Sequence, residues 1–108
     1  MRGRGLRWGI LRDMVAVLSL AWMTTSEVQA VMTRLRGLTY RKTIELLDEL
    51  QKEGSIVQEK DKKEKRYKWG ANKRGVLFWI KTVRAIPVWI AEAVSITRVV
   101  KALEEAEG

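Results

Sequence analysis

Apolar side chains recur at helical spacing in three successive segments of the first half of the chain. The spacing of three or four residues is typical of helices that turn one face toward a core. In the first segment, between residues 6 and 22, these positions are Ile10, Leu11, Met14, Val15, Leu18 and Trp22. In the second they are Val28, Val31, Met32 and Leu35, and in the third Tyr40, Ile44, Leu46, Leu47 and Leu50. Three amphipathic helices are therefore predicted, with Tyr40 on the core side of the third.

Capping residues set the predicted limits of the second and third helices. Thr24 stands three residues before Glu27, which is the spacing of a capping box. Gly37 is placed to end the second helix in the left-handed conformation, Thr39 to cap the third, and Gly54 to stop it. Two helices joined by a tight turn around Gly37 predict a helix-turn-helix.

Two short strands are predicted next, because charged and apolar side chains alternate there. They cover residues 55–60 and 66–69, and a charged loop over 61–65 joins them. The alternation places Tyr67 and Trp69 on the inward face, and Gly70 closes the hairpin.

Residues 72–107 return to helical spacing, with Asn72 as the candidate cap. One apolar stripe has a heptad-like spacing, at Val76, Trp79, Val83, Ile86, Ile90, Ala93, Thr97 and Val100. A second stripe runs through Trp89, Ile96, Val99 and Leu103. Pro87 is expected to kink this helix or to split it in two. We expect one stripe to cover the chain's own core and the other to meet a partner.

The order of these elements predicts a mainly α fold with a small two-stranded β-wing. It is a winged helix-turn-helix followed by a long C-terminal dimerisation helix, kinked at Pro87. We divide the 108 residues into a DNA-binding domain over 1–75 and a dimerisation segment over 76–108. A chain of this length has room for little more than one core.

Composition narrows the classes of function. The net charge of +8 at pH 7 favours a polyanionic partner, first nucleic acid and second an anionic membrane. The chain has no Cys and no His, so disulfides, a Cys nucleophile and a His base are excluded and a structural zinc site is effectively excluded. No spacing of Asp, Glu or Lys suggests catalysis. We therefore expect a protein that is not an enzyme and that uses no cofactor.

The third helix carries the first set of candidate DNA contacts, near its N-terminus. In helix-turn-helix proteins this part of the second helix meets base edges. Arg41 or Lys42 would pair with guanine, Glu45 with cytosine, and Thr39 and Thr43 with phosphate or base. The acidic residues Glu45, Asp48 and Glu49 restrict close contact to the first turns. The alternative is that these are ordinary solvated charges.

The wing is the stronger electrostatic signal. Residues 60–68 hold six cations against two carboxylates, a net charge of +4. Such charges suit DNA phosphates or the minor groove. The cations are Lys60, Lys62, Lys63, Lys65, Arg66 and Lys68. The alternative is that the wing is a solvated hairpin tip.

Arg2, Arg4 and Arg7 form a second basic patch near the N-terminus. They are either a flexible arm that contacts DNA or ordinary solvated charges.

Two segments of the chain also allow interpretations that involve membranes. Arg2 to Met23 has the outline of a secretory signal, and we expect a core helix there instead. Residues 76–97 contain Lys81, Arg84 and Glu92, which disfavours a spanning helix and leaves an in-plane amphipathic helix open. A dimer explains the two apolar stripes better. The expected interface comprises Val76, Trp79, Val83, Ile86, Trp89, Ile90, Ala93, Val94, Thr97 and Val100.

The segment from Thr24 to Gly75 resembles archaeal winged-helix DNA-binding proteins. The resemblance is carried by Thr39 to Leu50, by the step Glu53 to Val57, and by the close from Tyr67 to Gly75. PadR and MarR regulators share this plan, as do small archaeal chromatin proteins with a C-terminal coiled coil. The Trp-rich stripe and Pro87 depart from a plain coiled coil. The scarcity of Cys, Asn and Gln in a highly charged chain is typical of hyperthermophiles.

The resemblance implies a homodimer on double-stranded DNA, cytoplasmic and nucleoid-associated. The residues themselves suggest no small-molecule substrate, and their charges disfavour a membrane partner. The favoured function is a transcriptional regulator. A nonspecific architectural or chromatin protein, and an interaction module of an RNA or protein assembly, stay open as alternatives.

Overall fold

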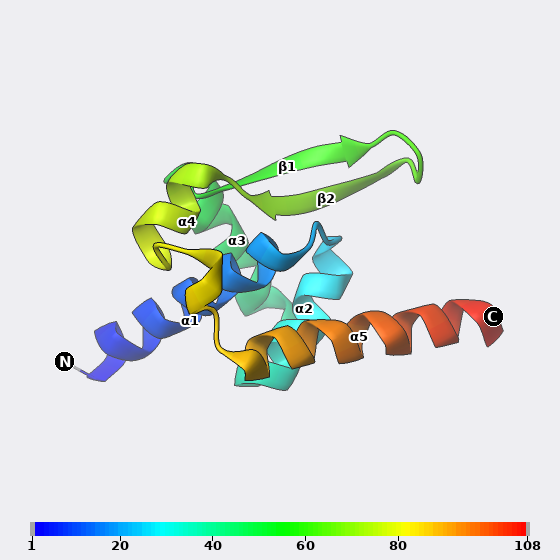
Figure 1. Ribbon diagram of the computed structural model, residues 1–108, viewed down its shortest axis with the longest axis horizontal. Coiled ribbons are helices and arrows are strands. Elements are labelled where there is room, and N and C mark those ends of the chain that lie inside the picture. The colour runs from blue at the N-terminus through cyan, green and yellow to red at the C-terminus, as the bar shows by residue number, and fades with distance from the viewer. Residues whose placement is uncertain (1, 108) are drawn as a thin grey trace.

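The computed structural model describes the backbone of residues 2–107 and the side chains of residues 5–107. The fold is mainly helical with one two-stranded antiparallel sheet, which confirms a winged helix-turn-helix with a C-terminal helix (Figure 1). The elements are α1 (Arg2–Leu20), α2 (Thr25–Arg36), α3 (Tyr40–Lys52), β1 (Ile56–Asp61), β2 (Arg66–Ala71), α4 (Lys73–Trp79), the 3-10 helix η1 (Val83–Ala85) and α5 (Val88–Glu107).

The predicted caps of the helix-turn-helix are confirmed. Thr24 Oγ1 accepts a hydrogen bond from the Glu27 amide at 3.2 Å, and Glu27 Oε1 accepts one from the Thr24 amide at 3.1 Å. Gly37 adopts the left-handed conformation with φ 65°. Thr39 Oγ1 accepts from the Lys42 amide at 3.2 Å and starts α3. Local chemistry alone therefore fixes where α2 ends and α3 begins.

Helix α1 runs through the centre of the molecule and is more buried than its pattern predicted. Every residue from Asp13 to Leu18 is buried, so this stretch has no solvent-facing side. The helix packs against α2, α4, α5 and β2. It ends at Leu20, and Trp22, which was predicted to belong to its apolar face, is 44% exposed.

The wing contains the two predicted strands and one pairing that the sequence did not indicate. Strand β1 pairs with β2 from Ile56 opposite Ala71 to Asp61 opposite Arg66, and the hairpin projects from the helices (Figure 1). Met23, between α1 and α2, adds a bridge to Trp69, with N–O distances of 3.0 and 2.7 Å. This bridge ties the base of the wing to the helices.

Two aromatic predictions have different outcomes on β2. Trp69 is buried, as its alternation predicted, and its indole N–H donates to Thr25 Oγ1 at 2.8 Å. Tyr67 is 59% exposed, so its predicted inward position is wrong. Alternation assigns Tyr67 and Trp69 to the same side of the strand, but the hairpin extends beyond the core before it reaches Tyr67.

The C-terminal region divides into α4, η1 and α5, and the expected break at Pro87 is confirmed. The break begins earlier, because α4 ends at Trp79 and Lys81 takes a left-handed φ of 68°. Trp79 is held against Trp8 of α1, with ring centroids 4.4 Å apart. The chain then turns so that α5 packs against α1 and α2.

This turn corrects part of the predicted dimer interface. Trp79, Ile90, Ala93, Val94 and Thr97 are buried in the chain's own core, so they offer no surface to a partner. Of the other predicted residues, Val76, Ile86 and Val100 are partly buried, whereas Val83 and Trp89 are exposed. The outer side of α5 instead exposes the second stripe, Trp89, Ile96, Val99 and Leu103. The pattern identified two stripes but did not show which one faces inward.

The start of α4 depends on close approach between Gly75 and the backbone at Ser55. A Cβ at Gly75 would lie 2.1 Å from the Ser55 carbonyl oxygen, whereas a Cβ at Gly5 in α1 would meet nothing within 4 Å. We therefore expect Gly75→Ala to lower the free energy of unfolding by about 1–3 kcal/mol. Gly5→Ala is the matched control and should raise it by about 0.5–1 kcal/mol through helix propensity. Thermal unfolding of both variants gives the comparison, and equal stability would contradict the packing at Ser55.

Candidate nucleic-acid interface

The first turn of α3 exposes some predicted DNA contacts and hides another. Arg41 and Lys42 are exposed beside the cap Thr39. Thr43 is fully buried, and its hydroxyl donates to the Thr39 carbonyl at 2.9 Å, so the prediction that it reaches DNA is wrong. Tyr40, expected in the core, is 58% exposed because the cap turns the first residue of α3 outward.

Charges along the outer face of α3 nearly cancel. Lys42 Nζ lies 3.3 Å from Glu45 Oε2, and Arg7 of α1 forms an ion pair with Glu49. Asp48 is exposed on the same helix. Arg41 has no carboxylate partner within the described part of the chain. Positive charge is therefore available at the N-terminal end of α3 and not along its length.

The tip of the wing is a structured turn built on Asp61. Asp61 Oδ1 accepts hydrogen bonds from the amides of Lys63 at 2.9 Å and Glu64 at 3.1 Å. The amide of Lys65, which has a left-handed φ of 58°, donates to the Asp61 carbonyl at 2.7 Å. The segment predicted as a charged loop is thus held in one conformation by the side chain of its first residue.

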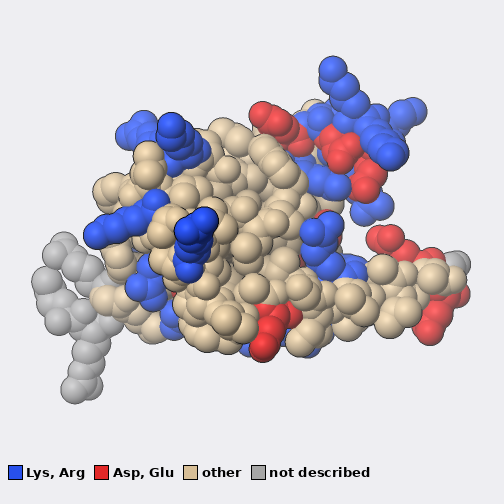
Figure 2. All heavy atoms as spheres, viewed as in Figure 1, with Lys and Arg blue, Asp and Glu red and all other residues tan. Residues whose placement is uncertain are grey.

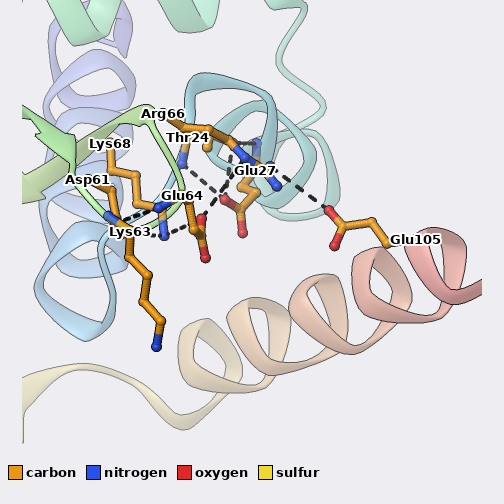
Figure 3. Close-up of polar contacts among 8 residues, drawn as sticks. All are labelled: Thr24, Glu27, Asp61, Lys63, Glu64, Arg66, Lys68 and Glu105. Carbon is orange, nitrogen blue, oxygen red and sulfur yellow. Dashed lines mark hydrogen bonds and ion pairs between the residues drawn. The ribbon is translucent and has the colours of Figure 1, made fainter.

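Lys68 joins the two sides of this turn (Figure 3). Its Nζ lies 3.2 Å from Asp61 Oδ2 and 2.9 Å from Glu64 Oε2. The hydrogen bonds from the Glu64 amide and from Lys68 hold the pKa of Asp61 below its ordinary value. The carboxylates of Glu64 and Asp61 raise the pKa of Lys68. Lys68 is therefore engaged within the wing.

Arg66 connects the wing to the far end of α5. Its guanidinium lies 4.0 Å from Glu64 and 3.9 Å from Glu105, as Figure 3 shows. Both contacts are solvent-exposed, and such pairs contribute about 0–1 kcal/mol each. Lys101 Nζ also lies 3.0 Å from Ser26 Oγ, across a polar cleft of about 210 Å³ between the wing, the start of α2 and α5.

The six predicted wing cations therefore fall into two groups. Arg66 and Lys68 have carboxylate neighbours. Lys60, Lys62, Lys63 and Lys65, here called the wing lysines, are exposed and form no ion pair with a described residue. Figure 2 shows cations crowding the outer end of the wing, where they surround a few carboxylates.

The predicted N-terminal arm has a different structure. The residues considered as an arm begin α1, whose backbone is helical from Arg2. The side chains of Arg2 and Arg4 lie outside the described residues. Arg7 is held by Glu49 of α3, and in this contact the first turns of α1 lie against the helix-turn-helix.

Other kinds of site find no support in the described residues. No group of three or more His, Cys, Asp or Glu is placed to hold a metal ion within residues 2–107. No helix of the described chain combines the length and apolar character required to span a membrane.

Comparison with known proteins shows a likeness of fold to a solved structure. No protein-family model matches the chain, and no curated protein sequence matches it. Its fold is similar to the solved structure of a single-residue variant of ZitR from Lactococcus lactis, with a TM-score of 0.56 and 12% sequence identity. The match covers 92% of this chain and 74% of ZitR. At this identity the likeness shows a shared winged-helix fold, while the archaeal and PadR-like parts of the resemblance stay predictions.

The network at the wing tip predicts how Asp61 titrates. Its folded pKa is depressed, so the wing gains stability from the ionised carboxylate above the ordinary pKa and loses it as pH falls through the lower, folded value. Lys68→Met should raise the pKa of Asp61 only part of the way toward normal, because the amides of Lys63 and Glu64 still donate to it. NMR titration of the Asp61 carboxyl tests this. Titration of the wild type at the ordinary value would contradict the capped turn.

Proposed function

We propose that this protein binds double-stranded DNA as a dimeric transcriptional regulator. The observation that carries the proposal is the cluster of four exposed wing lysines, on a hairpin that projects from the helices. The fold likeness supports it, since ZitR is a MarR-family winged-helix regulator. The absence of Cys and His also removes the commonest catalytic and zinc-binding groups.

In this proposal the N-terminal turn of α3 enters the major groove. Arg41 is exposed and free to make a bidentate contact with guanine, while Thr39 is committed to capping. Lys42 and Glu45 form a pair in the free protein, and DNA would compete with Glu45 for Lys42. The carboxylates of Asp48 and Glu49 would repel phosphates, so the helix meets the groove by its tip.

The wing would lie along the DNA backbone. Its turn is fixed by Asp61 and Lys68, so the wing lysines lose little backbone freedom on binding. Lysine contacts to phosphate release condensed counterions, and this term gives affinity without reading sequence. Recognition by Arg41 and attraction by the wing are thereby assigned to separate elements.

Dimerisation is proposed through the outer side of α5, whose exposed stripe is Trp89, Ile96, Val99 and Leu103. Side chains this apolar are seldom left together in water by a soluble monomer. Glu92 lies on the same side, four residues before Ile96, and a partner must accommodate its charge. A two-fold axis beside α5 would present two copies of α3 to half-sites about one DNA turn apart.

A nonspecific architectural role is the second candidate, and the charge distribution favours it. Four cations that form no ion pair with a described residue lie together on the wing, whereas the charges on the outer face of α3 nearly cancel. A protein that holds DNA mainly by its wing would bind most sequences alike. Affinities for a selected and a random duplex at several salt concentrations separate the two candidates.

One prediction of the proposed function concerns the wing lysines. Replacing Lys62, Lys63 and Lys65 by Ala removes three of the wing lysines and should flatten the plot of log affinity against log salt by about 2–3 units. The matched control replaces Lys73, Lys81 and Arg84, which lie outside the wing and α3, and removes the same charge. Fluorescence anisotropy with duplex DNA gives both slopes. The proposal fails if the wing variant keeps the wild-type slope, or if the control flattens it equally.

The second prediction concerns the dimer. Val99→Asp adds a charge to the exposed stripe and should weaken self-association by roughly tenfold or more without unfolding the chain, because Val99 is 59% exposed. Val83→Asp is the control, because Val83 is also exposed and lies outside α5. Ile90→Asp is unsuitable, since Ile90 is 1% exposed and the change would disrupt the core. Sedimentation equilibrium decides the matter, and a wild type that remains monomeric at micromolar concentration would refute this interface.

A further inference from the structure

We infer that the end of the molecule opposite the wing tip docks onto an anionic phospholipid membrane. This surface, here called the basic-aromatic face, combines exposed apolar residues with cations from α1, α4 and the connector over 80–87. The apolar residues are Trp8, Leu77 and Phe78, and the cations are Arg12, Lys73, Arg74, Lys81 and Arg84. None of these residues belongs to the wing, to α3 or to the stripe of α5.

Acidic residues are excluded from the segments that build this face. No Asp or Glu occurs in residues 1–12 or in residues 65–91, although the chain contains 13 acids. In Figure 2 the carboxylates in view lie mainly on the wing and α5, while cations are scattered over the end formed by α4 and the connector. The chain's net charge of +8 is therefore unevenly distributed.

The three segments form one continuous surface. The rings of Trp8 in α1 and Phe78 in α4 lie 5.8 Å apart. Arg12 is one turn after Trp8, and it lines the same cavity as Lys81 of the connector. Lys73 lies one turn of α4 before Leu77, and Arg74 lies one turn before Phe78. Each cation is therefore a neighbour of one apolar side chain on the helix surface.

Carboxylates next to this surface are already engaged. Asp13 is 1% exposed and accepts a hydrogen bond from Arg36 Nε at 2.8 Å. Glu53, at the edge beside Arg74 and Phe78, accepts from the Trp79 indole N–H at 2.8 Å. The five cations of the face form no ion pair with any described residue. Their charge is available to an outside partner.

The apolar members are too exposed to belong to the chain's own core. Phe78 is 61% exposed, Leu77 57% and Trp8 49%. Aromatic and aliphatic side chains ringed by Lys and Arg are the composition of protein surfaces that insert into the headgroup region of a bilayer. The cations would meet lipid phosphates while the rings enter the acyl boundary.

The same charges argue against a second copy as the occupant. A two-fold contact through this face would bring five cations of one copy toward five of the other, with no acid of the face to offset them. Single-stranded nucleic acid fits less well, because base stacking uses open aromatic faces. Here the ring of Phe78 lies tilted beside Trp8 and packs edge-on against Trp79, and the third apolar member is a leucine.

Vesicle flotation tests the inference with the full chain. The wild type should float with vesicles of phosphatidylglycerol and phosphatidylcholine, should not float with phosphatidylcholine alone, and should dissociate as salt is added. Lys81→Ala with Arg84→Ala should weaken partition by roughly 10- to 30-fold, at about fivefold for each cation near the surface. Leu77→Ser with Phe78→Ser should weaken it while leaving the salt dependence in place.

The matched control is Lys62→Ala with Lys65→Ala, which removes the same charge from the wing. This pair should weaken DNA binding and leave flotation nearly unchanged, whereas Lys81→Ala with Arg84→Ala should do the reverse. Failure of the membrane inference is thus distinguishable from failure of the proposed function. The inference is overturned if anionic vesicles do not bind, if both vesicle types bind alike, or if the wing pair loses flotation equally. It is also overturned if the Leu77 and Phe78 substitutions abolish binding of a single-stranded oligonucleotide and leave flotation intact.

Discussion

The whole structure depends on the complete burial of one turn and a half of α1. From Asp13 to Leu18 every side chain is covered, although the helix would need to shield only one face in a simple bundle. Covering the other sides requires α2, α5, α4 and the base of β2, which are brought from distant parts of the sequence. Asp13 is included in this stretch, and Arg36 at the end of α2 compensates its charge across the helix pair. Removing Arg36 would leave a buried carboxylate without a partner, which is far costlier than losing an exposed ion pair.

The need to cover the buried turns of α1 also explains the path of the C-terminal region. Helix α4 ends at Trp79, whose ring packs against Trp8 of α1 with the two ring planes tilted by 43°. The reversal through Lys81, η1 and Pro87 returns the chain, and α5 then supplies Ile90, Val94 and Thr97 to the core. One stripe of α5 is thereby buried in the core, and the outer stripe remains exposed to solvent.

Charge divides the remaining surface among separate elements. The wing holds its tip by Asp61 and Lys68 and leaves four lysines free, while α3 carries nearly balanced charges. Apart from residues 65–71, which belong to the wing, the acid-free segments gather at the other end of the molecule. A net charge of +8 therefore consists of two basic regions with different neighbours: one beside a helix-turn-helix and one around exposed aromatic rings. Their separation is what allows each to be altered without changing the other.

Features that depend only on neighbouring residues can be predicted from the sequence. Capping at Thr24 and Thr39, the left-handed Gly37, the alternation of the wing and the break at Pro87 are local, and each is present in the structure. Candidate residues chosen for charge at exposed positions, such as Arg41 and the wing lysines, are indeed exposed.

The remaining features depend on tertiary packing. Periodicity is unable to tell which of two apolar stripes on α5 faces the core, because both have the same spacing. Periodicity placed Tyr67 and Tyr40 inward because it carries no information on where the core ends. It missed the bridge from Met23 to Trp69 because a single pair of residues has no period. Thr43 was lost as a DNA contact for the same reason, since its burial depends on how α3 docks and not on its neighbours in sequence.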